Sequence, residues 1–254
     1  MQHHELKAIY LYRSSASAAL DADALCAYVA ELLPAVATHL RGSYQTIVAR
    51  GLCPAPDSAM LATAVIQGIA PPPDAVRVAG IEPVVYDAFA LSAAMAEALR
   101  PAEAGLDCLH IDLSHRLMAT WDESDNRCHL RTVLCSQPSI VSIPGLVEAP
   151  ARPRKYHIMR LQFEALRMPD AIAELDEKFA GSFLTHGDDR LTEVAKGYIM
   201  QAVFYRLTGE AFCEDPSCRL HDAHWQEDML AAQLGDLYCE RHAAVLEACR
   251  PGKT

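Results

Sequence analysis

The sequence lacks an uninterrupted apolar run of about 18 residues, the length that a membrane-spanning helix requires, so we expect no membrane span. Its first apolar run extends only from Ala8 to Tyr12, which predicts no signal peptide and favours a cytoplasmic location. Positive charge is also scarce, because 22 Lys and Arg residues oppose 33 Asp and Glu residues and leave a formal net charge of -11. Such a chain repels phosphate backbones, and its densest basic stretch is only Arg152 to Lys155, so nucleic acid is not an expected partner.

Three common catalytic and nucleotide-binding motifs are absent as well. The sequence contains no Gly-rich phosphate loop, no dinucleotide-binding fingerprint and no Gly-x-Ser-x-Gly nucleophile motif. These absences argue against phosphate-loop nucleotide hydrolysis, a Rossmann-type cofactor site and a serine hydrolase of the α/β class. What is present is ordinary for a folded chain, since 51% hydrophobic and 22% charged residues over 254 positions predict a sizeable core in one large or two small domains.

The first half of the sequence predicts strands interleaved with helices. Short runs of apolar and β-branched residues indicate strands over 7–12, 36–40, 108–113 and 139–143, and a hairpin of 117–121 with 127–135. Apolar residues at helical spacing indicate helices over 21–33, 57–69 and 87–99. This order predicts the α/β class, with a mixed β-sheet and helices packed on it.

After residue 150 the sequence becomes almost entirely helical. Helical periodicity covers 155–168, 171–179 and 189–207, and Gly209 is placed to end the last of these helices. The composition changes near residue 150 without a Gly/Ser-rich linker. We therefore expect one compact domain with two subdomains, a mixed α/β sheet region over 1–150 and a helical zinc-binding region over 151–254.

The strongest chemical pattern lies among the nine cysteines. Cys213 and Cys218 form a Cys-x4-Cys pair around an Asp-Pro turn, and Cys239 with His242 forms a Cys-x2-His pair. Thiolates and imidazoles are ligands that zinc prefers, and a set of four protein ligands leaves no position for water. The pattern therefore predicts one structural Zn²⁺ ion. Four unrelated buried residues in a helical tail are the competing interpretation.

Two histidines are alternative ligands for the same ion. His221 and His224 lie three residues apart on an expected helix, where they also fit an ordinary, partly exposed helix face. The cysteines outside the zinc pattern are expected to be buried thiols, and Cys108, Cys128 and Cys135 fall within predicted strands.

A longer pattern connects these zinc candidates to the helix before them. Residues 204–209 read Phe-Tyr-x-Leu-Thr-Gly, Cys213 and the other three candidate ligands follow, and 224–227 read His-Trp-Gln-Glu. The pattern resembles the C-terminal part of the archaemetzincins, zinc metallopeptidases with a His-Glu-x-x-His-x-x-Gly-x-x-His-Cys motif, a Cys-x4-Cys-x-Met segment and a closing Cys-x2-Cys pair. Residues 139–146 resemble the strand before that family's active-site helix. The resemblance covers 105–247, is strongest to an archaeal branch and implies a metzincin-like fold.

The sequence departs from that family at every catalytic position. When the glycine and the following cysteine of the motif are aligned, the three catalytic zinc ligands fall on Ala202, Arg206 and Phe212, and the general base falls on Val203. None of these side chains can bind zinc or accept a proton from water at neutral pH. His242 replaces the closing cysteine and is still a zinc ligand. The resemblance therefore implies a catalytically degenerate protein, a pseudoenzyme, that keeps the structural Zn²⁺ and binds an unknown protein or peptide partner.

The alternative function is a zinc-dependent metallopeptidase or hydrolase with non-standard catalytic ligands. Such an enzyme would build its metal site from residues such as His186, Asp188, His221 and His224. The candidate catalytic residues lie at the start of the long helix or along it: His186, Asp188, Glu193, Arg206 and Glu210. The simpler interpretation is that Asp188 or Asp189 caps this helix.

Two further polar groups have ordinary structural interpretations. His110 and Asp112 point to one face of a predicted strand, where they form either a catalytic pair or a hydrogen-bonded pair within the sheet. The acidic turn 122–125 lacks the full calcium-loop pattern and is expected to be a solvated hairpin tip.

Overall fold

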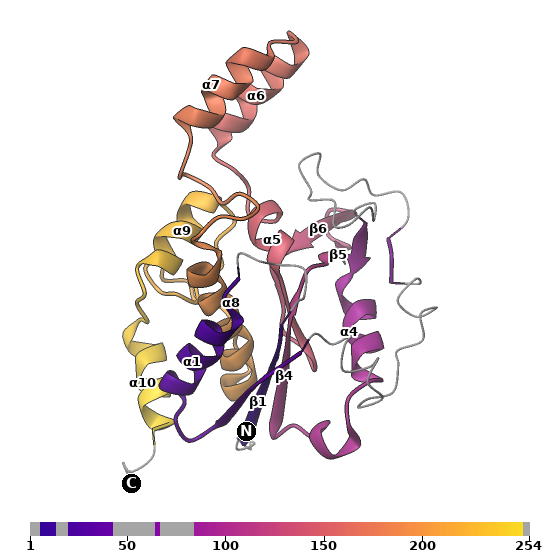
Figure 1. Cartoon of the computed structure of the whole chain (residues 1–254), viewed down its shortest axis with the longest axis vertical. Helices are drawn as coiled ribbons and strands as arrows, with labels where there is room; N and C mark the ends of the chain where they lie inside the picture. Colours follow the sequence, from indigo (N-terminus) through magenta and orange to yellow (C-terminus); the bar gives the residue numbers. More distant parts are fainter. Residues whose placement is uncertain (1–5, 14–19, 43–63, 67–83, 251–254) are drawn as a thin grey trace.

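The computed structural model describes residues 6–13, 20–42, 64–66 and 84–250, which form the expected α/β fold (Figure 1). Its main sheet has five strands in the order β2-β1-β4-β8-β7. Their bounds are β1 (Ala8–Tyr12), β2 (Ala37–Arg41), β4 (Cys108–Ser114), β7 (Val133–Leu134) and β8 (Ser139–Ser142). Neighbouring strands pair in parallel except β7, which runs antiparallel to β8 at one edge. The predicted mixed sheet is therefore confirmed.

Helices cover both faces of this sheet (Figure 1). α1 (Ala22–Leu32) and α8 (Leu191–Thr208) pack on one face, and α4 (Ala88–Ala96) packs on the other. Side chains alternate between the two layers, so Ile111 of β4 packs with α1 and α8. Every residue of β4 is buried, as expected for a strand with both faces covered.

A second sheet has three strands in the order β3-β5-β6. β3 (Val85–Asp87) pairs in parallel with β5 (Leu117–Asp122), and β5 pairs antiparallel with β6 (Arg127–Arg131), which confirms the predicted hairpin. The single strand predicted over 127–135 is wrong, because the chain bends at Thr132 and β7 joins the main sheet. Apolar patterning indicates strand conformation but not which sheet a strand joins.

The three helices predicted in the first half have different outcomes. α1 and α4 confirm two of them, and the side chains of Asp21 and Asp87 cap these helices by accepting hydrogen bonds from backbone N–H groups. The third, over 57–69, lies mostly outside the described residues. Its described residues 64–66 are not helical, since Val65 forms an isolated bridge with Tyr86 of β3. A short 3-10 helix, η1 (Pro101–Glu103), follows α4.

The helices predicted over 155–168, 171–179 and 189–207 are confirmed, with small shifts at their ends, as α6 (Arg154–Ala165), α7 (Pro169–Lys178) and α8. Three further helices had no predicted ranges: α5 (Ile143–Glu148), which lies where a loop was expected, α9 (Gln226–Leu234) and α10 (Glu240–Ala248). Gly209 ends α8 as predicted, with a φ of 81° that glycine adopts easily. The capping prediction for Asp188 or Asp189 is wrong, because Arg190 precedes the first turn and no side chain caps it.

The described residues share a large core, with one projecting element. Ile9, Val203 and Leu246 belong to the same apolar cluster although they lie in different parts of the chain. The hairpin of α6 and α7 projects from the rest (Figure 1) and has a small core of its own. The boundary near residue 150 stays a prediction. Among the described residues, no helix combines the length and the apolar character needed to cross a bilayer.

Candidate metal centre

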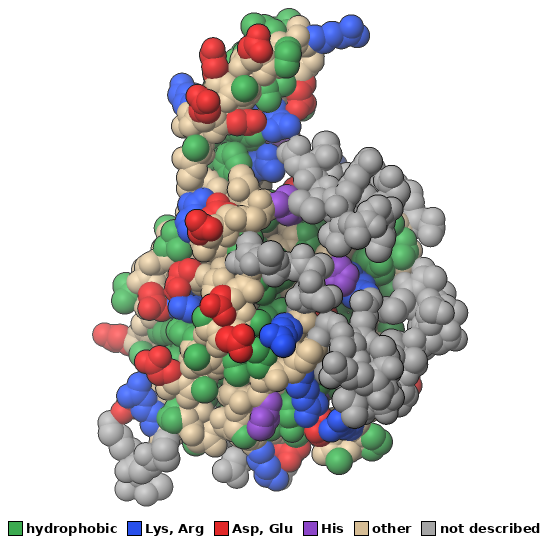
Figure 2. Space-filling model, viewed as in Figure 1, with side chains coloured by type: hydrophobic (Ala, Val, Ile, Leu, Met, Phe, Trp, Pro, Cys, Tyr) green, Lys and Arg blue, Asp and Glu red, His purple; other side chains and the backbone are tan. Residues whose placement is uncertain are grey.

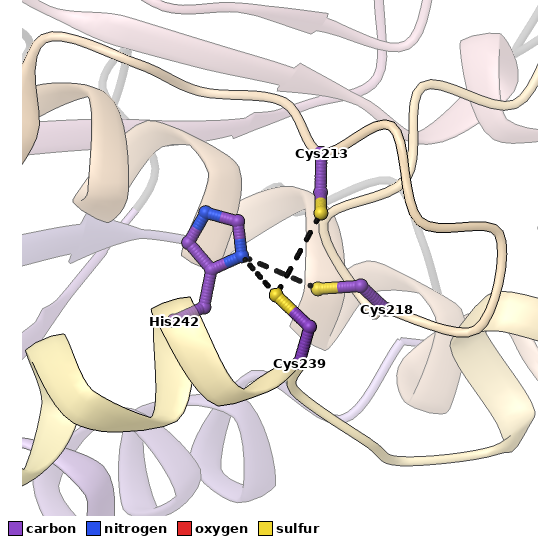
Figure 3. A group of neighbouring side chains, drawn as sticks. All are labelled: Cys213, Cys218, Cys239 and His242. Carbon is purple, nitrogen blue, oxygen red and sulfur yellow. Dashed lines mark hydrogen bonds between the residues drawn. The ribbon is translucent and has the colours of Figure 1, made fainter.

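Two neighbouring segments bring the predicted zinc ligands together (Figure 3). Cys213 and Cys218 lie in the loop after α8, where Asp215 shapes the turn by accepting hydrogen bonds from the backbone and hydroxyl of Ser217. Cys239 precedes the first residue of α10, and one helical turn then places His242 on the same side. We call these four residues the Cys3His cluster.

The spacing of the Cys3His cluster fits a tetrahedral zinc ion. The Sγ atoms of Cys213 and Cys239 are 3.8 Å apart, and His242 Nδ1 lies 3.5 Å from Cys218 Sγ and 3.1 Å from Cys239 Sγ. Zinc–sulfur bonds of about 2.3 Å place tetrahedral sulfur ligands about 3.8 Å apart. All four ligand atoms lie within 4.8 Å of one another, so a single ion can contact each of them.

The surroundings of the cluster favour the ligating forms of some members. Burial lowers the pKa of His242, and Arg241 lowers it further, which favours the neutral imidazole that metals bind. Burial opposes ionisation of Cys239, but hydrogen bonds from the backbone of His242 and from neighbouring thiols outweigh it and lower the pKa of that thiol. Burial raises the pKa of Cys218 to about 11, and the charge of a bound cation would favour its thiolate.

Packing from other elements fixes the cluster in place. The ring of Phe204 in α8 meets the ring of His242 edge-on at 5.0 Å between centroids. Arg219, next to Cys218, is completely buried and forms ion pairs with Glu193 of α8 and with Asp236 between α9 and α10. The sequence analysis missed Arg219, because nothing in its local sequence shows that its two carboxylate partners come from distant segments.

Neither alternative histidine joins the cluster. His221 and His224 are not helical as predicted but lie in the extended segment before α9. His221 Nδ1 lies 3.1 Å from the carbonyl oxygen of Cys213, so the ring is hydrogen-bonded to the backbone of the loop. His224 is exposed. The structure therefore favours the Cys-x2-His pair over these alternatives.

The candidate catalytic residues are not brought together. Each is engaged elsewhere: His186 with Glu148, Asp188 with Arg190, Glu193 with Lys196 and Arg219, Arg206 with the Leu106 carbonyl, and Glu210 with Arg241. His186 and Asp188 do line one cavity of about 440 Å³ at the base of the α6–α7 hairpin. Within the described residues, no metal-binding group contains any of the five.

His110 and Asp112 do not pair with each other, contrary to both sequence interpretations. His110 lies 2.8 Å from the hydroxyl of Tyr12 and 2.9 Å from the carbonyl oxygen of Glu103, so both ring nitrogens are satisfied. Burial raises the pKa of Asp112 to about 6, against the opposing effects of Arg116 and Ser114. Tyr12 lies on the neighbouring strand, in register with Asp112. Sequence spacing alone did not show that Tyr12, rather than Asp112, would be the partner of His110.

The four positions that the sequence analysis aligned with archaemetzincin catalytic residues do not form a metal site either. Ala202 and Val203 are fully buried in α8, Arg206 donates to the carbonyl of Leu106, and Phe212 is exposed. A catalytic zinc ion does not fit these residues, because none of them offers a neutral nitrogen, thiolate or carboxylate ligand.

The sequence analysis missed a cavity of about 830 Å³ beside the end of α8. Four aromatic side chains that line it are between 44% and 61% exposed: Phe89, Trp121, Tyr205 and Phe212. We call this feature the aromatic groove. Its four aromatic residues come from α4, β5, α8 and the loop after α8, so no local spacing could have predicted it. Leu134 of the edge strand β7 also lines it.

A second group of possible metal ligands lies at the predicted hairpin tip. Asp122, Asp125 and His129 are close enough to share an ion, and His129 Nε2 lies 2.8 Å from Asp125 Oδ2. These side chains are partly or fully exposed, which agrees with the solvated turn expected from the sequence.

The comparisons with known proteins give one match. A family described as "Probable metallopeptidase family (DUF6775)" matches residues 75–249, which is more than half of the chain. The matched range contains the whole Cys3His cluster and the aromatic groove. No curated protein and no solved structure matches the chain.

Proposed function

The chain belongs to this probable metallopeptidase family, and from that premise we propose that it is a catalytically degenerate, archaemetzincin-like member with a binding or scaffold role. In this proposal the Cys3His cluster holds one structural Zn²⁺ ion. The aromatic groove binds an apolar segment of a protein or peptide partner in the cytoplasm. The net charge of -11 supports a protein rather than a nucleic acid as that partner.

The ligand set of the Cys3His cluster carries the proposal. Catalytic zinc sites keep one position open for water, whereas sites with four protein ligands are closed and contribute to folding. The cluster ties the loop after α8 to the start of α10. A zinc ion held there would stabilise this contact without reacting with a substrate.

The aromatic groove supports the binding role. Binding sites are concave and largely apolar, and aromatic side chains that become buried at the centre of an interface are enriched among the residues that supply most of the binding energy. Arg131 and Glu210 also line the groove, Arg131 with its Nε donating to the hydroxyl of Thr120 and Glu210 within its ion pair with Arg241, so one charge of each sign lies beside a bound peptide. An apolar peptide segment would fit both the aromatic side chains and the two charged residues of the groove.

One observation favours the alternative, a metallopeptidase with non-standard ligands. In the part of the chain that the structure describes, Asp122, Asp125 and His129 form a further group that could hold an ion. A hydrolase built on this group would contain a second metal ion besides the structural one. The two functions therefore predict different metal contents.

Metal analysis of untagged protein tests the structural ion. We expect one zinc ion per chain, lost in Cys213→Ser because three ligands hold zinc less tightly than four. Cys249→Ser is the matched control, since Cys249 is partly buried but lies outside the cluster, and it should retain zinc. Two ions per chain would favour the metallopeptidase. Unchanged zinc content in Cys213→Ser would contradict the four-ligand assignment.

A peptidase assay tests the proposal that the protein has lost catalytic activity. The purified protein is expected to leave quenched fluorescent peptides and denatured casein uncut. Chelator-sensitive hydrolysis that copurifies with the intact chain would overturn the proposal.

A display library of random peptides tests the aromatic groove. We expect the wild-type protein to enrich peptides with apolar side chains and the Trp121→Ser/Phe212→Ser variant to lose this enrichment. Leu237→Ser is the control, because Leu237 is 60% exposed and lies outside the groove. Equal enrichment by the wild type and the groove variant would contradict binding at this site.

A further inference from the structure

One side of the aromatic groove is formed by the segment that leads into the metal cluster. Residues 209–212 are consecutive and all of them line the groove, and the next residue is the ligand Cys213. We call residues 209–212 the groove wall. Neighbouring Cα atoms are about 3.8 Å apart, so the position of Cys213 restricts that of Phe212. The groove and the Cys3His cluster therefore share one backbone segment, although none of the four ligands lines the groove.

Core packing holds the groove wall only weakly. Of its four residues Ala211 alone is buried, and its side chain is a single methyl group, whereas Phe212 is 45% exposed. Neither Ala211 nor Phe212 has a hydrogen bond to another residue that the structure describes. Burial of one methyl group contributes little compared with burial of a large apolar side chain. The groove wall therefore depends on how its two ends are held.

The two ends of the groove wall are held by different parts of the molecule. At the first end, the backbone N–H of Glu210 donates to the hydroxyl of Thr208, the last residue of α8, over 3.2 Å. At the second end, the backbone N–H of Cys213 donates to the carbonyl of Leu220 over 2.9 Å. The second end thus follows the loop that carries two of the four ligands.

An ion pair also connects the groove wall to α10. Glu210 lies 3.0 Å from Arg241, which is next to the ligand His242. Both side chains of the pair are more than half exposed, and exposed ion pairs contribute little to stability. Without a cation, the ligand atoms of the cluster interact through thiol hydrogen bonds, which are weak. Bonds from one ion to Cys213 on one side and to Cys239 and His242 on the other would join the groove wall to α10 far more strongly.

We propose that zinc binding to the Cys3His cluster holds the groove wall in the position that binds a peptide, so that the two sites strengthen each other. The peptide part of this proposal rests on the binding role proposed above. Zinc is expected to raise the affinity of the groove for its peptide about tenfold, which lies within the usual range of coupling between two sites. Because such coupling is reciprocal, a bound peptide should raise the zinc affinity of the cluster by the same factor.

The fluorescence of Trp121 tests the link without a peptide. The chain contains two tryptophans, so Trp225→Phe leaves Trp121, in the groove, as the single one. Removal of zinc with a chelator is expected to shift the emission of Trp121 and change its quenching by acrylamide, and added zinc should restore both. The control has two glycines inserted between Phe212 and Cys213, which detach the groove wall from the cluster. It should retain one zinc ion per chain, and its Trp121 emission should not respond to zinc.

Fluorescence anisotropy with a labelled peptide from the display library measures the coupling itself. Figure 2 shows hydrophobic side chains scattered among charged ones over α9 and α10, so this face suits an apolar peptide less well than the groove does. The zinc-loaded wild type is expected to bind the peptide about tenfold more tightly than the zinc-free protein. The insertion variant should bind it with the lower affinity whether or not zinc is present.

The other outcomes separate failure of the coupling from failure of the binding role. A zinc response of Trp121 in a protein that binds no peptide would support the link and contradict the binding role. Equal peptide affinity of the zinc-loaded and zinc-free wild type would overturn the coupling, as would a Trp121 emission that does not respond to zinc. An insertion variant that behaves like the wild type would exclude the backbone of the groove wall as the link. Complete loss of circular dichroism in the zinc-free wild type would also overturn the proposal, because the effect would then be unfolding.

Discussion

Arg219 joins four parts of the molecule through one buried guanidinium group. It donates to the hydroxyl of Tyr28 in α1, to the carbonyl of Gln233 in α9, and to the carboxylates of Glu193 and Asp236. A buried charge is costly unless it is paired, and these contacts pair both terminal nitrogens of the guanidinium group, while its Nε has no hydrogen-bond partner among the described residues. Arg219 therefore orients the loop that carries Cys218.

Substitution of Arg219 should separate the effect of its volume from that of its charge. Arg219→Ala is expected to lower the free energy of unfolding by about 3 kcal/mol, because it leaves a cavity and removes several hydrogen bonds. Arg219→Met should cost less, since it fills the volume and the carboxylates of Glu193 and Asp236 are 34% and 62% exposed and can be hydrated. Urea unfolding measures both. A loss below about 1 kcal/mol in Arg219→Ala would contradict this role.

Protonation of the buried Asp112 side chain should favour the folded state. Burial raises its pKa from 3.8 to about 6, so the folded protein binds more protons than the unfolded chain between these values. Its contribution therefore favours folding below this window and is lost as the pH rises through it. Asp112→Asn mimics the protonated form and should be more stable than the wild type at pH 7, by up to about 3 kcal/mol.

Urea unfolding from pH 4 to pH 7 checks this prediction. The stability difference between Asp112→Asn and the wild type should shrink toward zero at the acidic end. Both proteins share the Cys3His cluster, so any effect of acid on the metal cancels in the difference. Asp189→Asn, at an exposed position, is the control and should change little. A constant difference across the series would contradict a perturbed Asp112.

At the scale of single residues, the sequence predicted the Cys3His cluster but neither Arg219 nor the aromatic groove. The four cluster residues occur in two short pairs, and each pair converges through local geometry, a turn or one turn of helix. The aromatic residues of the groove have no such local relation, because the fold alone brings together the four segments that carry them. The same reason explains why Tyr12, and not Asp112, proved to be the partner of His110.

Among the helices, α8 and α9 approach closely at Gly197. A Cβ atom on Gly197 would overlap the buried carboxamide of Gln233, whose nitrogen donates to the carbonyl of Arg219 over 2.8 Å. The glycine is thus required by packing, even though it weakens the helix by about 1 kcal/mol relative to alanine.

Gly197→Ala is therefore expected to destabilise the protein, by about 1–3 kcal/mol, despite the better helix propensity of alanine. The test is a double-mutant cycle with Gln233→Ala, measured by urea unfolding. In the Gln233→Ala background the overlap is absent, and Gly197→Ala should become stabilising. A Gly197→Ala protein more stable than the wild type would show that the close approach carries no constraint.

At the scale of elements, single helices and strands were predicted better than the pairing of strands into sheets. Helical periodicity is local, so 189–207 was enough to predict α8 and its end at Gly209. Strand pairing is not local, and the run 127–135 gave no sign that β6 and β7 belong to different sheets. The helix expected for His221 and His224 failed because the cluster turn keeps that segment extended.

Across the whole molecule, removal of zinc should have an effect confined to one region. The cluster joins the loop after α8 to α10, whereas the main sheet is held by the packing of α1, α4 and α8. Treatment with a chelator is expected to raise hydrogen exchange in 209–249 and leave β1 and β4 protected. Loss of protection throughout the chain would show that the metal stabilises the entire fold.

The order of strands in the main sheet also determines when each strand can find its partners while the ribosome synthesises the chain. Ala8 of β1 pairs with Cys108 of β4, which the ribosome adds 100 residues later. At roughly 5–20 residues per second, this interval lasts about 5–20 s. β1, α1 and β2 can already form a parallel unit, but the side of β1 that receives β4 has no partner during that time. The nascent chain thus exposes an apolar strand edge, the kind of surface that chaperones protect from aggregation.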